Sequence, residues 1–322
     1  MTRSSRLSRV AAARVLRAER QRQRMRAGPL RDRRIKAVTL GRYRRHLRWW
    51  FRWCRATGHG LPSTRLELDL VCSAYAECLY QEGESKSVLA NTLSAVVHYV
   101  PSLKGSLRGA WGLYAVWHRE EPEAQCPAID VATLQALAGA MAYRGYPRAA
   151  VATLLAHHCC LRTVEMLTLA TTDILLGLQR SLLILRSTKV GQRMGVDEEV
   201  TVHDAFVLRC LRRLVPSLPR GATLLGMSGL EYRKLWKLVV ADLRLPRDVQ
   251  PYGLRRGGAT CLFQHSGSFD AVAVRGRWHT LKALRVYIKG ALLEWAVAEV
   301  EPQDRQLRLR FAQVLHLLVG TR

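Results

Sequence analysis

Long apolar runs and paired cysteines are both missing from this chain of 322 residues. No stretch approaches the ~18–20 consecutive apolar residues that a membrane-spanning helix requires, and the first residues form no hydrophobic signal core. The eight cysteines are scattered without any C-x-x-C pair, so neither a disulfide framework nor a zinc ribbon is indicated. We therefore expect a globular protein of a reducing, intracellular compartment that does not associate with membranes.

Acidic residues are also scarce, because 25 Asp and Glu stand against 51 Lys and Arg and leave a net charge of +26. Such an excess of positive charge indicates a polyanionic partner, most simply a nucleic acid. The chain has neither a GxxxxGK[ST] phosphate loop nor a carboxylate cluster suited to Mg²⁺, so no cofactor or metal is predicted. Only eight of the basic residues are lysines; arginine binds phosphate in a bidentate way, although GC-rich coding would produce the same bias.

Positive charge is concentrated at the N-terminal end. Residues 1–36 carry 13 basic and two acidic side chains, and the segment offers almost no apolar face that a helix could bury. We expect residues 1–34 to form a basic, flexible arm. An arginine-rich and acid-poor segment is also compatible with a mitochondrial transit peptide.

Residues 35–121 show the apolar spacing of helices, in the segments 37–58, 64–83, 85–100 and 105–120. Gly58 and Gly83 would end the first two helices, and Ser85 or Ser87 would cap the third. We expect a small all-α domain whose tryptophans fill the core rather than stack on bases.

Residues 122–128 contain two prolines and few apolar residues, and are expected to link this domain to a second one over residues 129–322. The second domain has a mostly helical pattern. Its β-like segments 180–189 and 198–203 flank the loop sequence GQRMG and predict a hairpin. The predicted fold class is therefore mainly α with a small β-hairpin or sheet, in two domains.

Four stretches of the second domain carry residues suited to chemistry. Arg162 and Glu165 in CLRTVEMLTL share a face of a helical turn, and Lys189 lies at the tip of the hairpin. Taken alone, these residues are better explained as a structural ion pair and a solvated loop lysine. In PYGLRRGGAT, Arg255 and Arg256 fall at a helix start, where the helix dipole disfavours them unless an anion is bound.

The adjacent Gly257 and Gly258 allow another backbone or DNA to approach closely. The fourth stretch, RGRWHTLKALRVYIKG, places Trp278 nine residues before Tyr287. That tyrosine is either an ordinary buried side chain or a nucleophile surrounded by positive charge. The sequence HHCC over residues 157–160 looks like a metal cluster, but consecutive helix positions point about 100° apart, so core packing is expected there instead.

The order of these residues resembles the tyrosine recombinase, or phage-integrase-like, superfamily. The likeness extends from Ile129 to the C-terminal end, and residues 35–121 look like the core-binding domain of that family. The sequence LRRGGAT and the tryptophan before the tyrosine look like those of family members carried by eukaryotic mobile elements. The resemblance implies a two-domain DNA clamp, in which a helical core-binding domain is joined to a mixed α/β catalytic domain.

The resemblance also implies a role for each residue at the site. Arg162 and Arg255 would clamp the non-bridging oxygens of the scissile phosphate, and Glu165 would support Arg162. Trp278 would donate its indole N–H to the phosphate. Lys189 would protonate the departing 5′ oxygen.

Tyr287 would be the nucleophile, on a short helix anchored by Leu281 and Leu284. A tyrosine has a pKa of about 10 and needs stabilised charge around it, which two arginines and a lysine would supply without a metal ion. The family's usual histidine, three residues before the second arginine, is Tyr252 here. A phenol is a poor base at neutral pH, so a weakly active or inactive DNA-binding protein derived from a recombinase stays open as an alternative.

The implied function is DNA cleavage and rejoining through a 3′-phosphotyrosyl intermediate, in site-specific recombination or the integration of a mobile element. The expected partner is double-stranded DNA, on which the protein would act as a homo-oligomer, namely a tetramer. In a eukaryote the compartment would be the nucleus. A type IB topoisomerase would share most of the site and is a further alternative. The residues expected to contact DNA are Arg44, Arg45, Arg48 and Arg256.

Overall fold

The structure is a computed structural model that describes residues 15–26, 34–60, 62–122, 125–186, 197–297 and 300–320. The chain divides into two compact units, residues 1–124 and 125–322, called here the N-terminal and C-terminal units. The boundary falls within the segment 122–128 that was expected to be a linker. None of the described helices is both long and apolar enough to cross a membrane.

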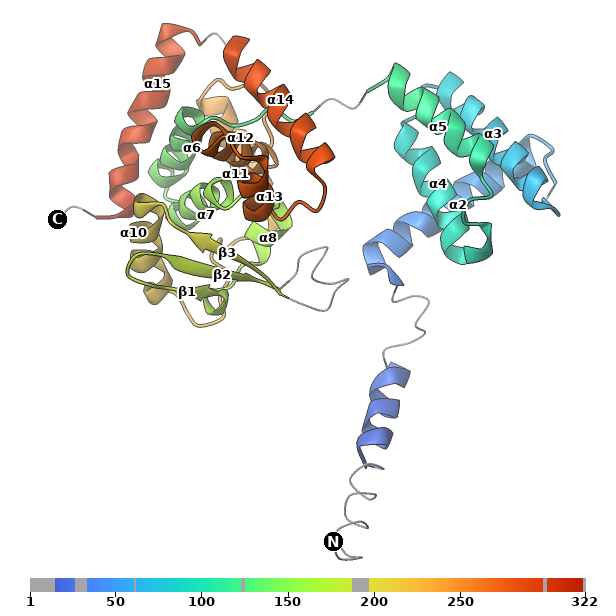
Figure 1. The fold of residues 1–322 in the computed structure, drawn as a ribbon, viewed down its shortest axis with the longest axis horizontal. Coiled ribbons are helices and arrows are strands. Elements are labelled where there is room, and N and C mark those ends of the chain that lie inside the picture. The colour runs from blue at the N-terminus through green and yellow to red at the C-terminus, as the bar shows by residue number, and fades with distance from the viewer. Residues whose placement is uncertain are drawn as a thin grey trace, which may run out of the picture. The chain divides into compact units, whose positions relative to one another are not determined.

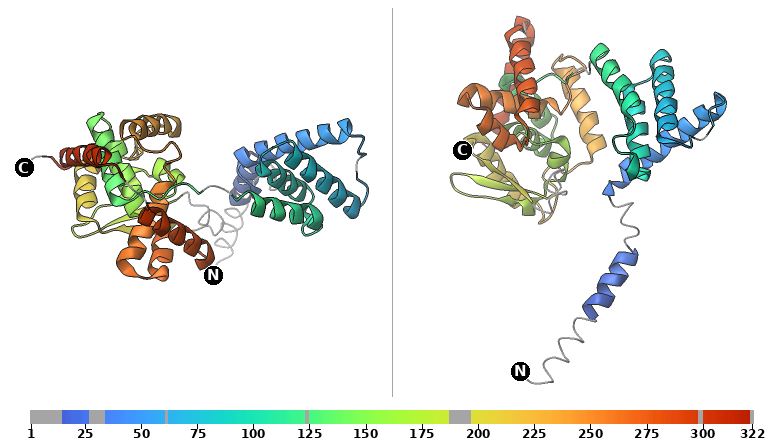
Figure 2. Two further views of the ribbon diagram at one scale, coloured as in Figure 1. Left: turned by 90° about the horizontal axis from the view of Figure 1, so that it is seen from above. Right: turned by 45° about the vertical axis from the view of Figure 1, so that its right-hand side comes forward.

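The described residues of the N-terminal unit form helices joined by turns and short connecting segments (Figures 1 and 2). Residues 15–26 form a helix in which every side chain is exposed. The helices α2 (Ala37–Ala56), α3 (Arg65–Gln81), α4 (Lys86–Tyr99) and α5 (Arg108–Glu120) follow, with the 3-10 turn η2 (Pro101–Leu103) before α5. Their shared core contains Trp50, Tyr75, Leu89, Leu93 and Trp117.

Local sequence explains where these helices begin and end. The Thr64 side chain accepts a hydrogen bond from the backbone N–H of Glu67, whose carboxylate accepts one from the Thr64 N–H, which makes a capping box for α3. Ser85 accepts from the N–H of Ser87 and caps α4, as predicted. Gly83 follows α3 with φ +69°, a left-handed conformation that glycine adopts without a Cβ clash.

The tryptophans of this unit divide between core and surface. Trp50 and Trp117 are 3% and 4% exposed, as predicted, but Trp49 and Trp111 are 42% and 37% exposed, so the prediction is wrong for them. Neighbouring residues on a helix point about 100° apart, and Trp49 therefore cannot share the buried face of Trp50. It lies instead on the solvent side of α2 among arginines.

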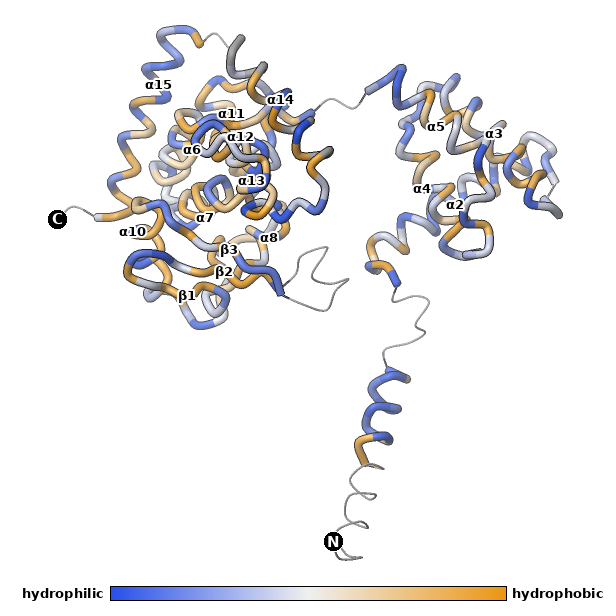
Figure 3. The backbone as a smooth tube through the Cα atoms, in the orientation of Figure 1, coloured by the Kyte–Doolittle hydropathy of each residue, from blue (hydrophilic) through white to orange (hydrophobic). Residues whose placement is uncertain are grey.

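The C-terminal unit is built around α6 (Val131–Tyr143) and α7 (Pro147–His158), which are buried along most of their length. Figure 3 shows apolar segments gathered toward these two helices. Around them lie the helices α8 (Thr163–Thr168), α10 (Ala205–Leu214), α11 (Gly229–Asp242), α12 (Gly253–Ser266), α13 (Phe269–Gly276), α14 (Leu281–Val297) and α15 (Pro302–Gln313). Short 3-10 turns are η3 (Thr171–Asp173), η4 (Val215–Ser217) and η5 (Val314–Leu318).

A three-stranded antiparallel sheet in the order β1–β2–β3 lies at one edge of this unit (Figure 1). Its strands are β1 (Ile174–Leu175), β2 (Ser181–Leu185) and β3 (Glu198–Val202), and Leu183 of β2 pairs with both Ile174 and Val200. The predicted pairing of β2 with β3 is confirmed. The sequence does not predict β1, because two residues are too few to show a strand's alternation.

Gly257 and Gly258 let α12 lie very close to its neighbours. A Cβ atom at Gly257 would lie 1.9 Å from the carbonyl oxygen of Ile129, and one at Gly258 would lie 1.9 Å from that of His157. The close approach that this glycine pair predicts is therefore made inside the unit, and not to DNA. This close packing also brings Arg255, in the first turn of α12, into the interior.

Candidate active site

An arginine–glutamate pair marks the start of α8. The Glu165 carboxylate accepts a hydrogen bond from the backbone N–H of Arg162 at 2.8 Å and another from its Nη1 at 2.5 Å. A carboxylate in the first turn also interacts favourably with the helix dipole. Glu165 is 3% exposed, whereas the Arg162 side chain is 29% exposed. Glu165 thus holds Arg162 at the surface with its guanidinium group partly open to a ligand.

Arg255 is drawn into the unit from the first turn of α12. It is 2% exposed, and it donates from Nη1 to the carbonyl oxygen of Cys160 at 2.5 Å and from Nη2 to that of Gly276 at 2.6 Å. Its Cζ lies 4.1 Å from the centre of the Trp278 ring, which is a cation–π contact. Burial, together with the charges of neighbouring arginines, lowers the pKa of Arg255 to about 10, so the group is still charged at neutral pH.

A third arginine, Arg277, joins the site. Its Nη2 donates to Glu165 at 2.6 Å, and its Nε lies 3.6 Å from a carboxylate oxygen of Glu198 at the start of β3. The Arg277 side chain is 6% exposed. Nothing in the sequence marks this residue, because Glu165 is 112 residues away along the chain.

These three arginines, called here the arginine cluster, carry more positive charge than their carboxylate partners cancel. Glu165 and Glu198 supply two negative charges against three positive ones. The described hydrogen bonds of Arg255 go to carbonyl oxygens, which leave its charge in place. A buried charge without a counterion is costly, and a bound anion offsets that cost. The cluster is therefore suited to a phosphodiester, whose oxygens accept charge-assisted hydrogen bonds.

Trp278 stacks on Arg255, and Tyr252 lies three residues before Arg255 in the sequence. A Cβ atom at Gly276 would lie 1.7 Å from the Trp278 ring, so the indole folds back across that glycine and places its face on Arg255. Tyr252 directly precedes α12 and is 42% exposed. It is three residues before Arg255, so the two side chains lie on the same side of that turn.

Two predicted site residues fall where the structure describes less. Lys189 lies outside the described residues, and so does the side chain of Tyr287, although the backbone of α14 around it is described. Leu284 and Ile288 of α14 are fully buried in a small cluster with residues of α12 and α13. The predicted anchoring of α14 by Leu284 is confirmed. It is wrong for Leu281, which is 36% exposed.

The predicted DNA contact of Arg256 is not what the structure shows. Arg256 is 2% exposed, and its Nη1 donates to the carbonyl oxygen of Cys126 at 2.9 Å. Arg256 lies one residue after Arg255 on α12, which packs closely against its neighbours. Its side chain is therefore buried, and it binds the segment before α6. Arg44, Arg45 and Arg48 are all exposed along α2, and their DNA contacts stay a prediction.

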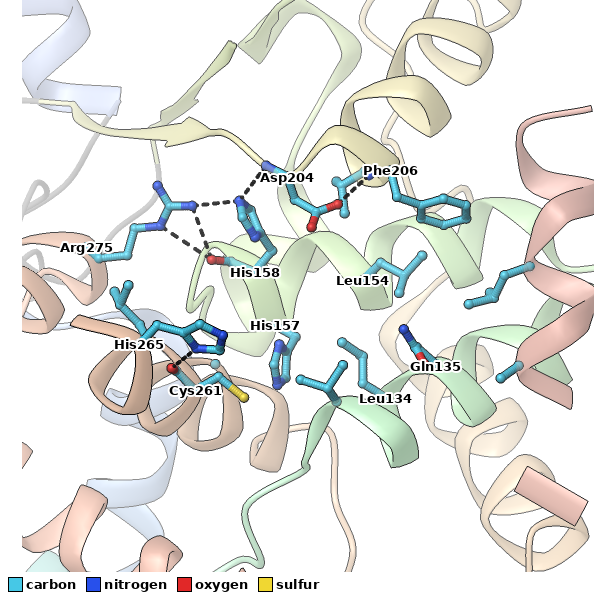
Figure 4. A pocket seen from close by; sticks show the side chains of 16 residues that line it. Leu134, Gln135, Leu154, His157, His158, Asp204, Phe206, Cys261, His265 and Arg275 are labelled. Carbon is cyan, nitrogen blue, oxygen red and sulfur yellow. Dashed lines mark hydrogen bonds between the residues drawn. The ribbon is translucent and has the colours of Figure 1, made fainter. Parts of the chain in front are cut away.

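A separate cavity of about 610 Å³ lies further along α12 and is lined by His157, His158, Cys261, His265 and Arg275, among others (Figure 4). His157 donates a hydrogen bond from Nε2 to the carbonyl oxygen of Ile129 at 3.0 Å. Burial lowers the pKa of both His157 and His158 to about 4, so the two rings are neutral at pH 7. The HHCC segment thus contributes two neutral histidines to the packing, as predicted, with His157 buried and His158 half-buried.

No protein-family model matches the sequence, and no curated protein does. Several solved structures do match this chain. The XerH site-specific recombinase, bound to palindromic difH substrate in a post-cleavage complex, matches with a TM-score of 0.52 and 15% identity over 74% of this chain and 73% of its own. The Tn1549 transposon integrase matches with a TM-score of 0.52 and 13% identity in complex with transposon right end DNA, over 86% of this chain and 94% of its own. In complex with circular intermediate DNA, it matches with a TM-score of 0.50 and 12% identity, over 82% and 98%.

XerH is a site-specific recombinase, and the second protein is the integrase of a transposon. Their likeness to this chain shows that the mostly helical chain with its small antiparallel sheet has the tyrosine recombinase fold. The fold expected from the motif order is thereby confirmed, at a level of sequence identity where the fold alone is shared.

Proposed function

We propose that the protein cleaves and rejoins DNA strands through a 3′-phosphotyrosyl intermediate, in site-specific recombination or in the integration of a mobile element. The observation that carries this proposal is the excess positive charge of the arginine cluster within a tyrosine recombinase fold. The matching XerH and Tn1549 integrase structures each contain DNA, which supports the same class of substrate for this chain.

In the proposed reaction, Arg162 and Arg255 hold the two non-bridging oxygens of the scissile phosphate and stabilise the charge that develops on them. The Tyr287 hydroxyl oxygen attacks phosphorus, and the bond from phosphorus to the 5′ oxygen breaks. Lys189 gives a proton to that departing oxygen. One phosphate ester replaces another, so a 5′ hydroxyl can later reverse the step and reseal the strand without ATP.

The proton of the attacking tyrosine must leave as the new bond forms. Tyr252 occupies the position where the family's usual histidine would accept it, and a phenol is a poor base at neutral pH. We therefore expect Tyr252 to act as a hydrogen-bonding group, and we expect cleavage to be slow at neutral pH and faster as the pH rises.

The N-terminal unit supplies a second positively charged surface. Arg44, Arg45 and Arg48 are exposed on α2 beside the exposed Trp49, and the helix of residues 15–26 adds further exposed arginines. Such side chains neutralise phosphates and release counterions. In the proposed complex, the two units close around DNA as a clamp. Recombination cuts four strands, so four copies would act together.

A suicide substrate tests the proposal directly. It is a duplex nicked just beyond the cleavage point, so that the short 5′-hydroxyl fragment diffuses away and the covalent intermediate accumulates. A pool of such duplexes with randomised sequence serves first, and the sequences recovered with the protein become the defined substrate. We expect an adduct that survives SDS and maps to Tyr287. Tyr287→Phe should abolish the adduct and leave DNA affinity nearly unchanged, because only a hydroxyl group is removed.

Tyr252 favours a second candidate, a DNA-binding protein derived from a recombinase that no longer cuts. Salt-sensitive DNA binding without an adduct, in the natural protein and in Tyr252→His alike, would select it. A gain of several orders of magnitude in adduct formation with Tyr252→His would mean that the natural protein is nearly inactive. A modest change in rate would support the hydrogen-bonding role.

A further inference from the structure

Three consecutive residues, Gly276 to Trp278, contact Arg255 directly and reach Arg162 through Glu165; these are the two arginines that the proposed function assigns to the phosphate. The Gly276 carbonyl oxygen accepts from Arg255 at 2.6 Å, and the Trp278 ring lies 4.1 Å from the Arg255 guanidinium carbon. The residue between them, Arg277, donates to Glu165 at 2.6 Å. The other oxygen of Glu165 accepts from Arg162 at 2.5 Å. One short segment thus supports two side chains that are far apart in the sequence.

The backbone of this segment makes the double contact possible. Arg277 has φ 57° and ψ 47°, a left-handed conformation in which a residue with a Cβ atom is strained. The N–H groups of Arg277 and Trp278 donate to the carbonyl oxygens of Val274 and Ala273, which is the Schellman pattern at the end of α13. Glycine is the usual residue at this position. An arginine there carries a backbone cost that its side-chain contacts must offset.

The side chain of Arg277 lies between two carboxylates. It donates to Glu165 and lies 3.6 Å from Glu198, and it is 6% exposed. If Glu165 were paired with Arg162 alone, the carboxylate would cancel the charge of Arg162. With Arg277 present, that carboxylate is shared, and the described cluster keeps three positive charges against two negative ones. Without Arg277 the charges of the described cluster balance to zero, so the cluster would stabilise a dianion-like transition state less.

We propose that Arg277 is a positioning residue for strand cleavage. Its guanidinium group holds Glu165 so that Arg162 points at the phosphate, and it preserves the positive charge of the cluster. Through its contacts with Glu198 and Glu165, it also links the start of β3 to the start of α8. This inference rests on the proposed function, since it assigns Arg277 to the same reaction. A merely structural Arg277 would affect the stability of the fold but would not act on the reaction through Arg162.

The test measures the single-turnover rate of adduct formation on the suicide duplex recovered with the natural protein, at saturating protein. Arg277→Gln should slow the rate by about 100-fold while DNA affinity stays the same, because electrostatic groups at the transition state typically contribute that much. Arg277→Lys keeps the positive charge, so its rate should lie between the rates of Arg277→Gln and of the natural protein. Arg277→Gly relieves the left-handed strain but should be as slow as Arg277→Gln. A normal rate for Arg277→Gly would show that only the backbone matters and would overturn the proposal.

A double-mutant cycle separates positioning from stability. In an Arg162→Lys background, Arg277→Gln should slow cleavage by less than about threefold, because its effect passes through the Arg162 guanidinium group. Full additivity of the two losses would refute the inference. A substrate with a neutral methylphosphonate at the cleavage point needs less positive charge, so the Arg277→Gln loss should shrink on it. An unchanged loss on that substrate would count equally against the proposal.

Arg144 provides a matched control, because it is an arginine of the same unit paired with Asp242 at 2.6 Å on the surface. Arg144→Gln should leave the rate unchanged. If Arg277→Gln does not fold, Arg277→Lys and Glu165→Gln carry the test, with slower cleavage expected from both and normal rates overturning the proposal. No adduct from the natural protein would refute the proposed function and, with it, this role. An adduct that forms normally in the Arg277 variants would refute this role alone.

Discussion

Acid should destabilise the C-terminal unit through His158, which links three of its elements. The ring lies at the end of α7, and its Nε2 accepts from Arg275 of α13 at 2.8 Å. The same nitrogen accepts from the backbone N–H groups of His203 and Asp204, between β3 and α10, at 3.2 Å each. Figure 4 shows the bonds from Arg275 and Asp204 meeting at this ring. A protonated Nε2 is a donor and can accept none of them, so the fold requires the neutral ring.

The size of the effect follows from the pKa of His158 in the two states. Burial, followed by the charge of Arg275, lowers the pKa from about 6.5 in the unfolded chain to about 4 in the fold. Because the folded pKa is the lower one, the contribution is complete above about pH 6.5 and is lost progressively as the pH falls toward 4. Between pH 7 and pH 5, one such histidine lowers the free energy of unfolding by about 2 kcal/mol.

The assay is urea unfolding of the full chain at pH 7 and at pH 5, for the natural protein and for His158→Gln. A glutamine carbonyl can still accept hydrogen bonds but does not titrate in this range. The natural protein should lose about 2 kcal/mol more than the variant over this interval. His157 is present in both proteins, so its own titration cancels in the comparison. An identical pH dependence for the two proteins would refute the reasoning.

The remaining predictions concern the leaving group, the basic arm and the packing of α12. Lys189→Ala should slow cleavage of an ordinary phosphodiester but spare a 5′-bridging phosphorothiolate, whose leaving group needs no proton; equal loss on both substrates would show that Lys189 has a binding or structural role only. Deleting residues 1–30 should weaken binding similarly on all DNA sequences and flatten its salt dependence, by roughly 0.9 in slope for each phosphate that the arm neutralises; a change in site preference would contradict this. Gly258→Ala should lower the free energy of unfolding by about 3 kcal/mol, because its Cβ would meet the His157 carbonyl oxygen at 1.9 Å. Gly41→Ala, on an exposed turn of α2 with nothing within 4 Å, is the matched control, and equal stability of the two variants in urea would refute the packing argument.

Short-range signals predicted much of the secondary structure. Gly83 and Ser85 end one helix and begin the next as expected, because a cap or a left-handed turn involves only neighbouring residues. The Arg162–Glu165 pair formed as its spacing of three predicts, for the same reason. The tryptophans were predicted less well, since their common helical spacing does not show which face of α2 meets the other helices.

The burial of Arg256 shows where local reasoning ends. Two adjacent arginines at a helix start looked alike in sequence, and both are 2% exposed in the structure. Arg255 stacks on Trp278 beside the other arginines, whereas Arg256 bonds the carbonyl oxygen of Cys126, 130 residues earlier. The glycines that follow them explain the depth of burial, because they remove the side chains that would have kept α12 away from Ile129 and His157.

By itself, the sequence determined the basic character of the protein, the helix boundaries set by caps and glycines, and the order of Arg162, Glu165, Arg255 and Trp278. These depend on composition or on contacts between residues a few positions apart. Only the tertiary structure decided that Arg277 shares Glu165 with Arg162 across 112 residues of chain, and that the cluster retains a positive charge. The reason is that a side chain's electrostatic environment depends on which distant segments pack around it, and the path of the folded chain sets that packing.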